Sequence, residues 1–146
     1  MRKINYIVVH CSATREGCTL TSEALEAEHR RRGFRTTGYH YYIRRDGTVL
    51  GTRSLELPGV HCRGHNKYSI GICYEGGLDA RGNPKDTRTP EQRSALHLLV
   101  YQLLQQFRNA RVCGHRDLSP DLDGDGKVEP REWVKQCPCF EVSKEF

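Results

Sequence analysis

Two histidines and one cysteine of this chain combine the residue types that hold a catalytic zinc ion. His10 ends the first apolar run, His115 follows the last one, and Cys137 stands further along the chain. Imidazole nitrogen and thiolate sulfur are favoured zinc ligands, and a catalytic site keeps three protein ligands with a fourth position open to water. Such a site activates water and polarises a carbonyl group, as amide hydrolysis requires. Seven histidines and seven cysteines allow many other combinations, so spacing alone also fits two surface histidines and a buried thiol.

The elements that would position these residues alternate between strands and helices. Hydrophobic periodicity and turn residues predict strands over residues 6–9, 39–43, 48–50, 69–74 and 110–113, and helices over residues 21–32, 90–107 and 130–135. An Asp46-Gly47 turn joins the second and third strands in a hairpin. The order predicts a single α/β domain over residues 1–146, with a central mixed β-sheet flanked by helices and loops forming a common rim at the strand ends.

Size and composition narrow the class of protein. The 146 residues suit one domain. A hydrophobic content of 36%, without an apolar run near the roughly 20 residues that cross a bilayer, excludes membrane insertion. The net charge of +5 permits attraction to an anionic polymer but is too small to identify one. We expect a monomer with no nucleic-acid partner.

Cysteine usage and the N-terminal region bear on where the protein is made. Seven cysteines are an odd number at irregular spacing, which argues against a complete disulfide framework. Basic residues precede the first apolar run, but this run is about half as long as a signal-peptide core and ends at His10. We therefore expect cytoplasmic synthesis without a signal peptide and folding in a reducing compartment.

Short blocks of sequence surround the three candidate ligands and the segments between them. These blocks are Val9–Thr14, Gly38–Ile43, Arg45–Thr48, His61–Gly64 with Asn66, Ser69–Ile72, Gly114–Asp117 and Lys135–Pro138. In content and order they resemble zinc-dependent N-acetylmuramoyl-L-alanine amidases, especially the small bacteriophage lysozyme-type members, which share a fold with peptidoglycan recognition proteins. The resemblance covers nearly the whole chain. It implies zinc held by His10, His115 and Cys137, and hydrolysis of the amide bond between N-acetylmuramic acid and L-alanine in peptidoglycan.

The resemblance also implies that Tyr39 and Lys135 lie beside the open coordination position. A phenol can hydrogen-bond the attacking water, and an ammonium group can stabilise the oxyanion that develops on the carbonyl. From sequence alone, Tyr39 equally fits a packed strand aromatic and Lys135 a solvated helix charge. Cys139 offers a second thiol, and we select Cys137 because its Lys-x-Cys-Pro context matches the family.

One position departs from another branch of these amidases. In that branch a glutamate base follows the Ser-Ile-Gly-Ile block, whereas this chain has Cys73, which favours the arrangement built on Tyr39. Glu75 would share a strand face with Cys73, so it stays a candidate substitute base or substrate-binding residue. His61 is expected to line the substrate groove, with an ordinary loop histidine as the alternative.

Residues 121–132 have the ligand spacing of an EF-hand-type loop. The predicted ligands are the carboxylates of Asp121, Asp123, Asp125 and Glu132 and the backbone carbonyl of Lys127. Bound Ca²⁺ would fix the segment that joins His115 to Cys137. Pro120 argues against an entering helix, and the alternative is an acidic, hydrated turn.

These patterns predict a zinc-dependent, endolysin-like hydrolase of phage or prophage origin that degrades cell-wall peptidoglycan after holin-type or other release. A cytoplasmic amidase that recycles muropeptides is one alternative. A non-catalytic peptidoglycan-binding protein of the same fold is another, which Cys137 disfavours because binding-only relatives typically lose this ligand. A calcium-responsive binding protein would rest on the acidic loop alone.

Overall fold

A five-stranded mixed sheet forms the centre of the computed structural model, which describes residues 2–146. Its strands are β1 (Tyr6–Cys11), β3 (Tyr41–Ile43), β4 (Val49–Gly51), β5 (Ser69–Tyr74) and β7 (Arg111–Gly114), in the spatial order β4-β3-β5-β1-β7. The β3–β4 hairpin is antiparallel and the other pairs are parallel. The predicted α/β class and mixed sheet are confirmed.

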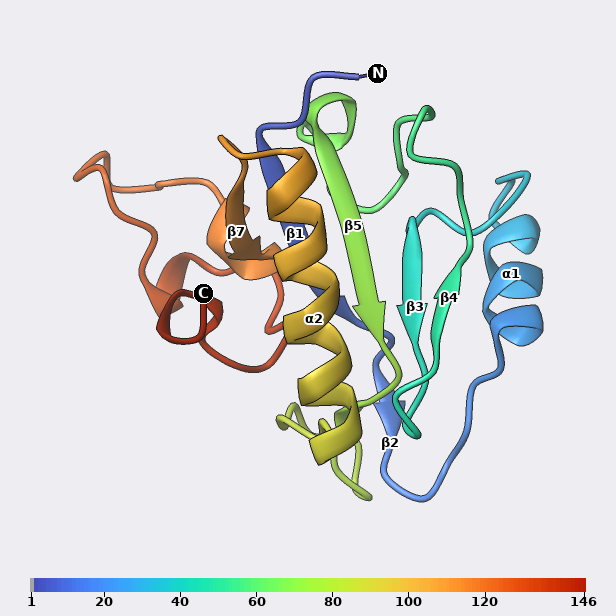
Figure 1. Cartoon of the computed structure of the whole chain (residues 1–146). Coiled ribbons are helices and arrows are strands. Elements are labelled where there is room, and N and C mark those ends of the chain that lie inside the picture. Colours follow the sequence, from blue (N-terminus) through green and yellow to red (C-terminus); the bar gives the residue numbers. More distant parts are fainter. Residues whose placement is uncertain (1) are drawn as a thin grey trace.

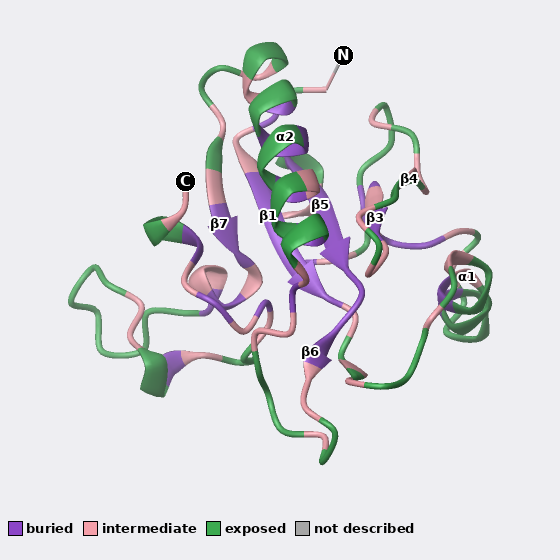
Figure 2. Ribbon diagram, turned by 60° about the horizontal axis from the view of Figure 1, so that its bottom comes forward, coloured by how far each residue is buried: buried purple, intermediate pink, exposed green. Residues whose placement is uncertain are grey.

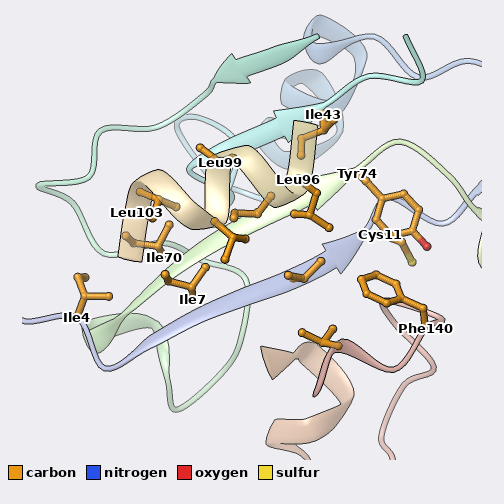
Figure 3. Packing of buried hydrophobic residues seen from close by; sticks show 14 residues of the cluster. Ile4, Ile7, Cys11, Ile43, Ile70, Tyr74, Leu96, Leu99, Leu103 and Phe140 are labelled. Atoms are coloured by element: carbon orange, nitrogen blue, oxygen red, sulfur yellow. The ribbon is translucent and has the colours of Figure 1, made fainter. Parts of the chain in front are cut away.

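Helix α2 (Pro90–Gln106) covers one face of the sheet (Figure 1). It begins with the predicted capping box, in which Thr89 and Gln92 each accept the other's backbone N–H. Its buried leucines pack against the isoleucines of β1 and β5, as the close view in Figure 3 shows. The opposite side of α2 is exposed (Figure 2). Burial of each large apolar side chain contributes about 1.5–3 kcal/mol, so this layer anchors the two central strands.

Helix α1 (Ser22–Arg31) lies beside the β3–β4 hairpin (Figure 1). Its Leu25 joins Tyr42 of β3 and Cys73 of β5 in a second, smaller buried cluster. The helix begins at Thr21, whose side chain accepts the Ala24 N–H, and it is followed by Gly33 with a φ of 94°. Neither α1 nor α2, the two α-helices within residues 2–146, has the combination of length and apolar character needed to cross a bilayer.

Strand alternation and parallel pairing place His10 beside the segment that follows β7. Ile7, Val9 and Cys11 of β1 belong to the cluster under α2, so His10 points to the other face of the sheet. Because β1 and β7 run parallel with Val9 opposite Gly114, the residues that come next are neighbours across the strands. His115 begins the short 3-10 helix η2 (His115–Leu118) at this carboxyl edge of the sheet.

The helix predicted over residues 130–135 is wrong. Only a single 3-10 turn forms, η3 (Pro130–Glu132). The Val134 N–H, which an α-helix would direct to the carbonyl of Pro130, donates instead to the Ser119 side chain. A six-residue helix has too few internal hydrogen bonds to resist such competition. Lys135 and Cys137 therefore lie on an irregular segment held by tertiary contacts.

Two short strands were not expected from the sequence. β2 (Thr14–Arg15) pairs in parallel with β6 (Gly77–Leu78) in a separate two-stranded sheet. The remaining 3-10 helices are η1 (Asn66–Tyr68) and η4 (Val142–Lys144). β2 follows β1 in the chain and β6 follows β5, so the small sheet continues the pairing of these two strands beyond their carboxyl ends and fixes the neighbouring loops.

Candidate functional site

His10, His115 and Cys137 converge on one point. One ligand atom from each residue lies within 4.8 Å of the other two, and the two imidazole centroids are 4.6 Å apart. Donor atoms around a tetrahedral zinc ion are roughly 3.5 Å apart. The three side chains can therefore close around one ion with small movements. His10 is only 1% exposed, while His115 and Cys137 are half-buried, so the group faces outward on one side.

Backbone contacts hold Cys137 at this point. The N–H of Cys11 donates to the Cys137 sulfur at 3.1 Å, and the N–H of Arg116 donates to the Cys137 carbonyl at 2.9 Å. Gly114 makes the approach possible, because a Cβ at this position would lie 2.7 Å from the Pro138 ring. Gly114 and Pro138 both lie in the sequence blocks that surround the candidate ligands, but the local sequence does not reveal that they pack against each other.

The two thiols of the Cys-Pro-Cys segment are in different environments. Within residues 2–146, the converging group contains Cys137 and not Cys139. The Cys139 sulfur instead donates to the carbonyl of Gly77 at 3.4 Å. All seven cysteines are free thiols, in agreement with the predicted absence of a disulfide framework. Cys137, the sulfur selected from its sequence context, thus lies with the two histidines, whereas Cys139 does not.

Burial sets the protonation state of the deepest imidazole. The pKa of His10 lies well below its usual value, first because of burial and then because of the neighbouring His61, His115 and Lys135 side chains. A neutral imidazole has an unprotonated ring nitrogen, and metal binding requires one. A buried neutral histidine next to a second histidine and a thiol fits a borderline-soft divalent metal such as zinc.

A pocket of about 760 Å³ opens over this group and includes Tyr39 and Lys135 in its lining. The Tyr39 ring packs against His10 with their centroids 5.1 Å apart. Burial holds the pKa of Tyr39 well above its usual value, so the phenol stays protonated at neutral pH. Lys135 is exposed at the rim, where it also borders an adjoining pocket of about 530 Å³.

Comparisons with known proteins decide the family. The family model described as N-acetylmuramoyl-L-alanine amidase matches residues 1–138. The chain belongs to the N-acetylmuramoyl-L-alanine amidase family. The amidase is 35% identical over 143 residues to the endolysin of Klebsiella phage KP32, with 98% of this chain and 85% of the relative covered.

Solved structures agree with the fold of this amidase. N-acetylmuramoyl-L-alanine amidase LysC from Clostridium intestinale aligns with a TM-score of 0.75 and 26% identity, covering 99% of this chain and 82% of that one. PGRP-SA of Apis mellifera aligns with a TM-score of 0.73 over 99% of this chain and 82% of its own, and its 21% identity supports the fold alone. The predicted family and enzyme class are confirmed.

His61 of the amidase lines the pocket, but both of its ring nitrogens are already engaged. Its Nδ1 lies 2.8 Å from His10 Nε2, and its Nε2 lies 3.1 Å from the Ser69 hydroxyl. Burial, followed by the neighbouring positive charges, lowers the pKa of His61 to about 3. His61 is therefore a neutral imidazole that is hydrogen-bonded to His10.

Glu75 lies outside the residues that line the pocket. Its side chain is 1% exposed and accepts hydrogen bonds from the backbone N–H groups of Leu20 and Arg45 and from Arg44 Nε at 2.7–3.0 Å. Strand alternation does put it on the face of Cys73, near Leu20, as predicted. The carboxylate joins the β3–β4 hairpin to the loop before α1, and the structure does not bring it to the reacting centre as a base or substrate ligand.

Replacing Glu75 with glutamine is expected to lower the free energy of unfolding by about 2 kcal/mol at pH 7, because a buried charged acceptor is lost. Burial opposes ionisation, but the hydrogen bonds from Leu20, Arg44 and Arg45 outweigh it and lower the pKa of Glu75. The carboxylate therefore stabilises the fold above its unfolded pKa, and this contribution disappears as pH falls through the lower folded pKa. Urea unfolding at pH 7 and near pH 3 checks this: the difference between variant and wild type should shrink in acid. A large loss of kcat without loss of stability would instead restore Glu75 as a catalytic candidate.

The acidic loop brings four carboxylates together. One oxygen each from Asp121, Asp123, Asp125 and Glu132 lies within 4.8 Å of the others. Backbone N–H groups of the loop already donate to these oxygens, including that of Lys127 to Asp125 at 2.9 Å. Arg131 forms an ion pair with Asp123. The internal hydrogen bonds account for this loop as an acidic turn, and calcium binding stays a prediction.

Several charged residues of the pocket were not singled out as site residues. Arg32 and Glu28 come from the end of α1, and Arg63 comes from the loop that carries His61. In the sequence Arg32 is the last of three consecutive arginines, and nothing local distinguishes it from the other two. Arg63 lies within the His61–Gly64 block, which resembles the amidase family. This position inside a family-like motif is the sequence signal that could have identified Arg63 as a site residue.

Proposed function

We propose that this amidase hydrolyses the amide bond between N-acetylmuramic acid and L-alanine in peptidoglycan, with zinc held by His10, His115 and Cys137. The observation that carries the proposal is a two-nitrogen, one-sulfur donor set converging at the base of a pocket of about 760 Å³. When bound there, zinc would polarise the scissile carbonyl and lower the pKa of water. The family match and the endolysin relative support the same bond.

The two polar residues beside the group are assigned different roles in this proposal. Tyr39 keeps its proton at neutral pH, so its hydroxyl acts as a hydrogen-bond donor that orients the reacting groups and not as the base. The Lys135 ammonium stabilises negative charge that develops on the carbonyl oxygen. His10 and His115 act as ligands whose orientation is fixed by the carboxyl ends of two parallel strands.

Peptidoglycan, as the polymer or as released muropeptides, is the proposed substrate. Arg32, Arg63 and Lys135 outnumber Glu28 among the charged residues of the pocket, which favours a substrate that bears carboxylates, as peptide stems do. We infer action on the cell wall in the manner of an endolysin, supported by the endolysin of Klebsiella phage KP32. The cytoplasmic recycling reaction differs only in the size of the substrate.

The decisive experiment combines metal analysis with incubation on purified sacculi. Zinc near one equivalent and new free L-alanine amino termini, without new reducing sugar ends, are the expected results. Faster turnover of soluble muropeptides than of sacculi would favour recycling. Binding to sacculi without any released amine would identify a non-catalytic binding protein, the alternative that the recognition-protein relatives leave open.

Replacing Tyr39 with phenylalanine is expected to lower kcat about 100-fold while zinc content stays at the wild-type level. The substitution keeps the ring that packs on His10 and removes only the hydroxyl. Zinc analysis and amine release on the same preparation measure the two effects. Tyr41→Phe, on the adjoining strand, is the matched control and should keep the wild-type rate. An unchanged kcat in Tyr39→Phe would remove the phenol from the mechanism.

Calcium added to chelator-treated, zinc-reloaded enzyme is predicted to raise the melting temperature if residues 121–132 bind the ion. Asp121→Asn should abolish that shift, because it removes the charge of the first ligand. Calorimetry of both proteins with and without millimolar calcium makes the comparison. Equal melting temperatures in the wild type would leave the segment as an acidic turn.

A further inference from the structure

His61 occupies a slot in the protein that is shaped by two glycines. A Cβ built on Gly59 would lie 2.5 Å from the His61 ring, and one built on Gly71 would lie 2.7 Å from it. Gly71 stands in the middle of β5, where a residue with a side chain would ordinarily pack. The absence of both side chains lets the imidazole lie directly on backbone atoms, which leaves the ring little freedom to turn.

The loop that carries His61 is fixed on both sides of this residue. The side-chain oxygen of Asn66 accepts the N–H groups of both His61 and Cys62 at 2.9 Å. The N–H of Val60 donates to the carbonyl of Gly38 at 3.0 Å. Backbone and ring are thus both immobilised, and the position of each ring nitrogen follows from the fold.

The two ring nitrogens connect His10 to a buried hydroxyl. His61 Nδ1 lies 2.8 Å from His10 Nε2, and His61 Nε2 lies 3.1 Å from the Oγ of Ser69, which is fully buried. With His10 Nε2 occupied by this contact, the nitrogen left for a metal is Nδ1. A ligating nitrogen carries no proton, so the His10 proton must reside on Nε2 and be donated to His61.

We propose that His61 is a positioning residue for His10, accepting its Nε2–H and so presenting an unprotonated Nδ1 to the metal. This inference rests on the proposed zinc site. His61 then carries its own proton on Nε2 and donates it to Ser69. Histidine ligands commonly donate their second N–H to a protein acceptor, and loss of that acceptor typically costs 10–100-fold in metal affinity or activity. Here the acceptor is the imidazole of His61. Because both of its ring nitrogens are engaged, it is not available to bind substrate.

Two amide variants separate this role from a structural one. Asparagine at position 61 puts its oxygen near the place of Nδ1, whereas glutamine puts its amide near the place of Nε2. We expect His61→Asn to keep zinc affinity within about threefold of wild type and His61→Gln to weaken it about 10–100-fold. His65→Gln, on the same loop with its ring against Tyr6, is the control and should bind zinc as wild type does.

The measurement is the zinc dissociation constant from competition with a chromophoric chelator, beside the melting temperature of each metal-free protein. If His61 had only a structural role, His61→Gln would bind zinc better than His61→Asn, because glutamine preserves the contact with buried Ser69. Equal affinities for the two variants, tighter binding by His61→Gln, or a raised KM with unchanged zinc affinity would overturn the inference. Failure of the wild-type protein to bind zinc would instead refute the proposed metal site, so the two failures are distinguishable.

Discussion

Serine in place of Cys137 is expected to abolish zinc retention and amide hydrolysis together. Cys137 supplies the one sulfur of the converging group, and a serine hydroxyl keeps its proton at neutral pH and offers a weak ligand. The Arg116 N–H still donates to the backbone carbonyl of residue 137, and the serine oxygen can accept the Cys11 N–H in place of the sulfur, so the variant should fold. Zinc content after gel filtration and amine release from sacculi measure the two losses on one sample.

Cys139→Ser is the matched control for this substitution. It lies two residues away in the same Cys-Pro-Cys segment, and its sulfur contacts the Gly77 carbonyl instead of the histidines. Zinc content should remain at the wild-type level. Loss of zinc in Cys139→Ser together with full retention in Cys137→Ser would transfer the ligand assignment to Cys139.

Methionine in place of Lys135 is expected to lower kcat about 10²–10³-fold while zinc content is unchanged. This is the cost typical of removing one group that stabilises an oxyanion. Methionine keeps an unbranched apolar chain and removes the charge, and the exposed position makes an effect on folding small. Steady-state kinetics on a soluble muropeptide separate kcat from KM.

Lys144→Met provides the comparison for Lys135→Met. It also removes one exposed ammonium group, but from the short helix η4, so the net charge changes equally in the two proteins. Its kcat should match the wild-type value. A rise in KM without a fall in kcat for Lys135→Met would make this lysine a substrate-binding residue with no part in the transition state.

Most of the fold was predictable from the sequence because its main elements carry local signals. The capping box at Thr89 and the apolar β5 run identify their elements without reference to the rest of the chain. The segment after Pro130 carries a helical composition, but its Val134 N–H goes to Ser119, a contact between residues that no local pattern connects. The β2–β6 pair has two residues per strand, too few for a periodic signal.

The candidate site was predictable only in part. The resemblance identified His10, His115 and Cys137, and the structure brings these three together. Alternation predicted that Glu75, which directly follows β5, shares the face of Cys73, but nothing in the local sequence indicated that Arg44 would engage its carboxylate. The sequence shows glycines at positions 71 and 114, but only the structure shows that the His61 ring packs against the first and the Pro138 ring against the second.

The placement of the converging group has a consequence for when the enzyme becomes active. His10 belongs to an early strand, and Cys137 reaches it through a late segment that docks on Gly114 and Cys11. A nascent chain that has folded its sheet but not yet released this late segment from the ribosome lacks the sulfur. Under the proposed zinc site, catalytic competence therefore arises only after the segment that carries Cys137 has docked on the sheet, and a polypeptide cut anywhere between His10 and Cys137 loses it unless the pieces reassociate.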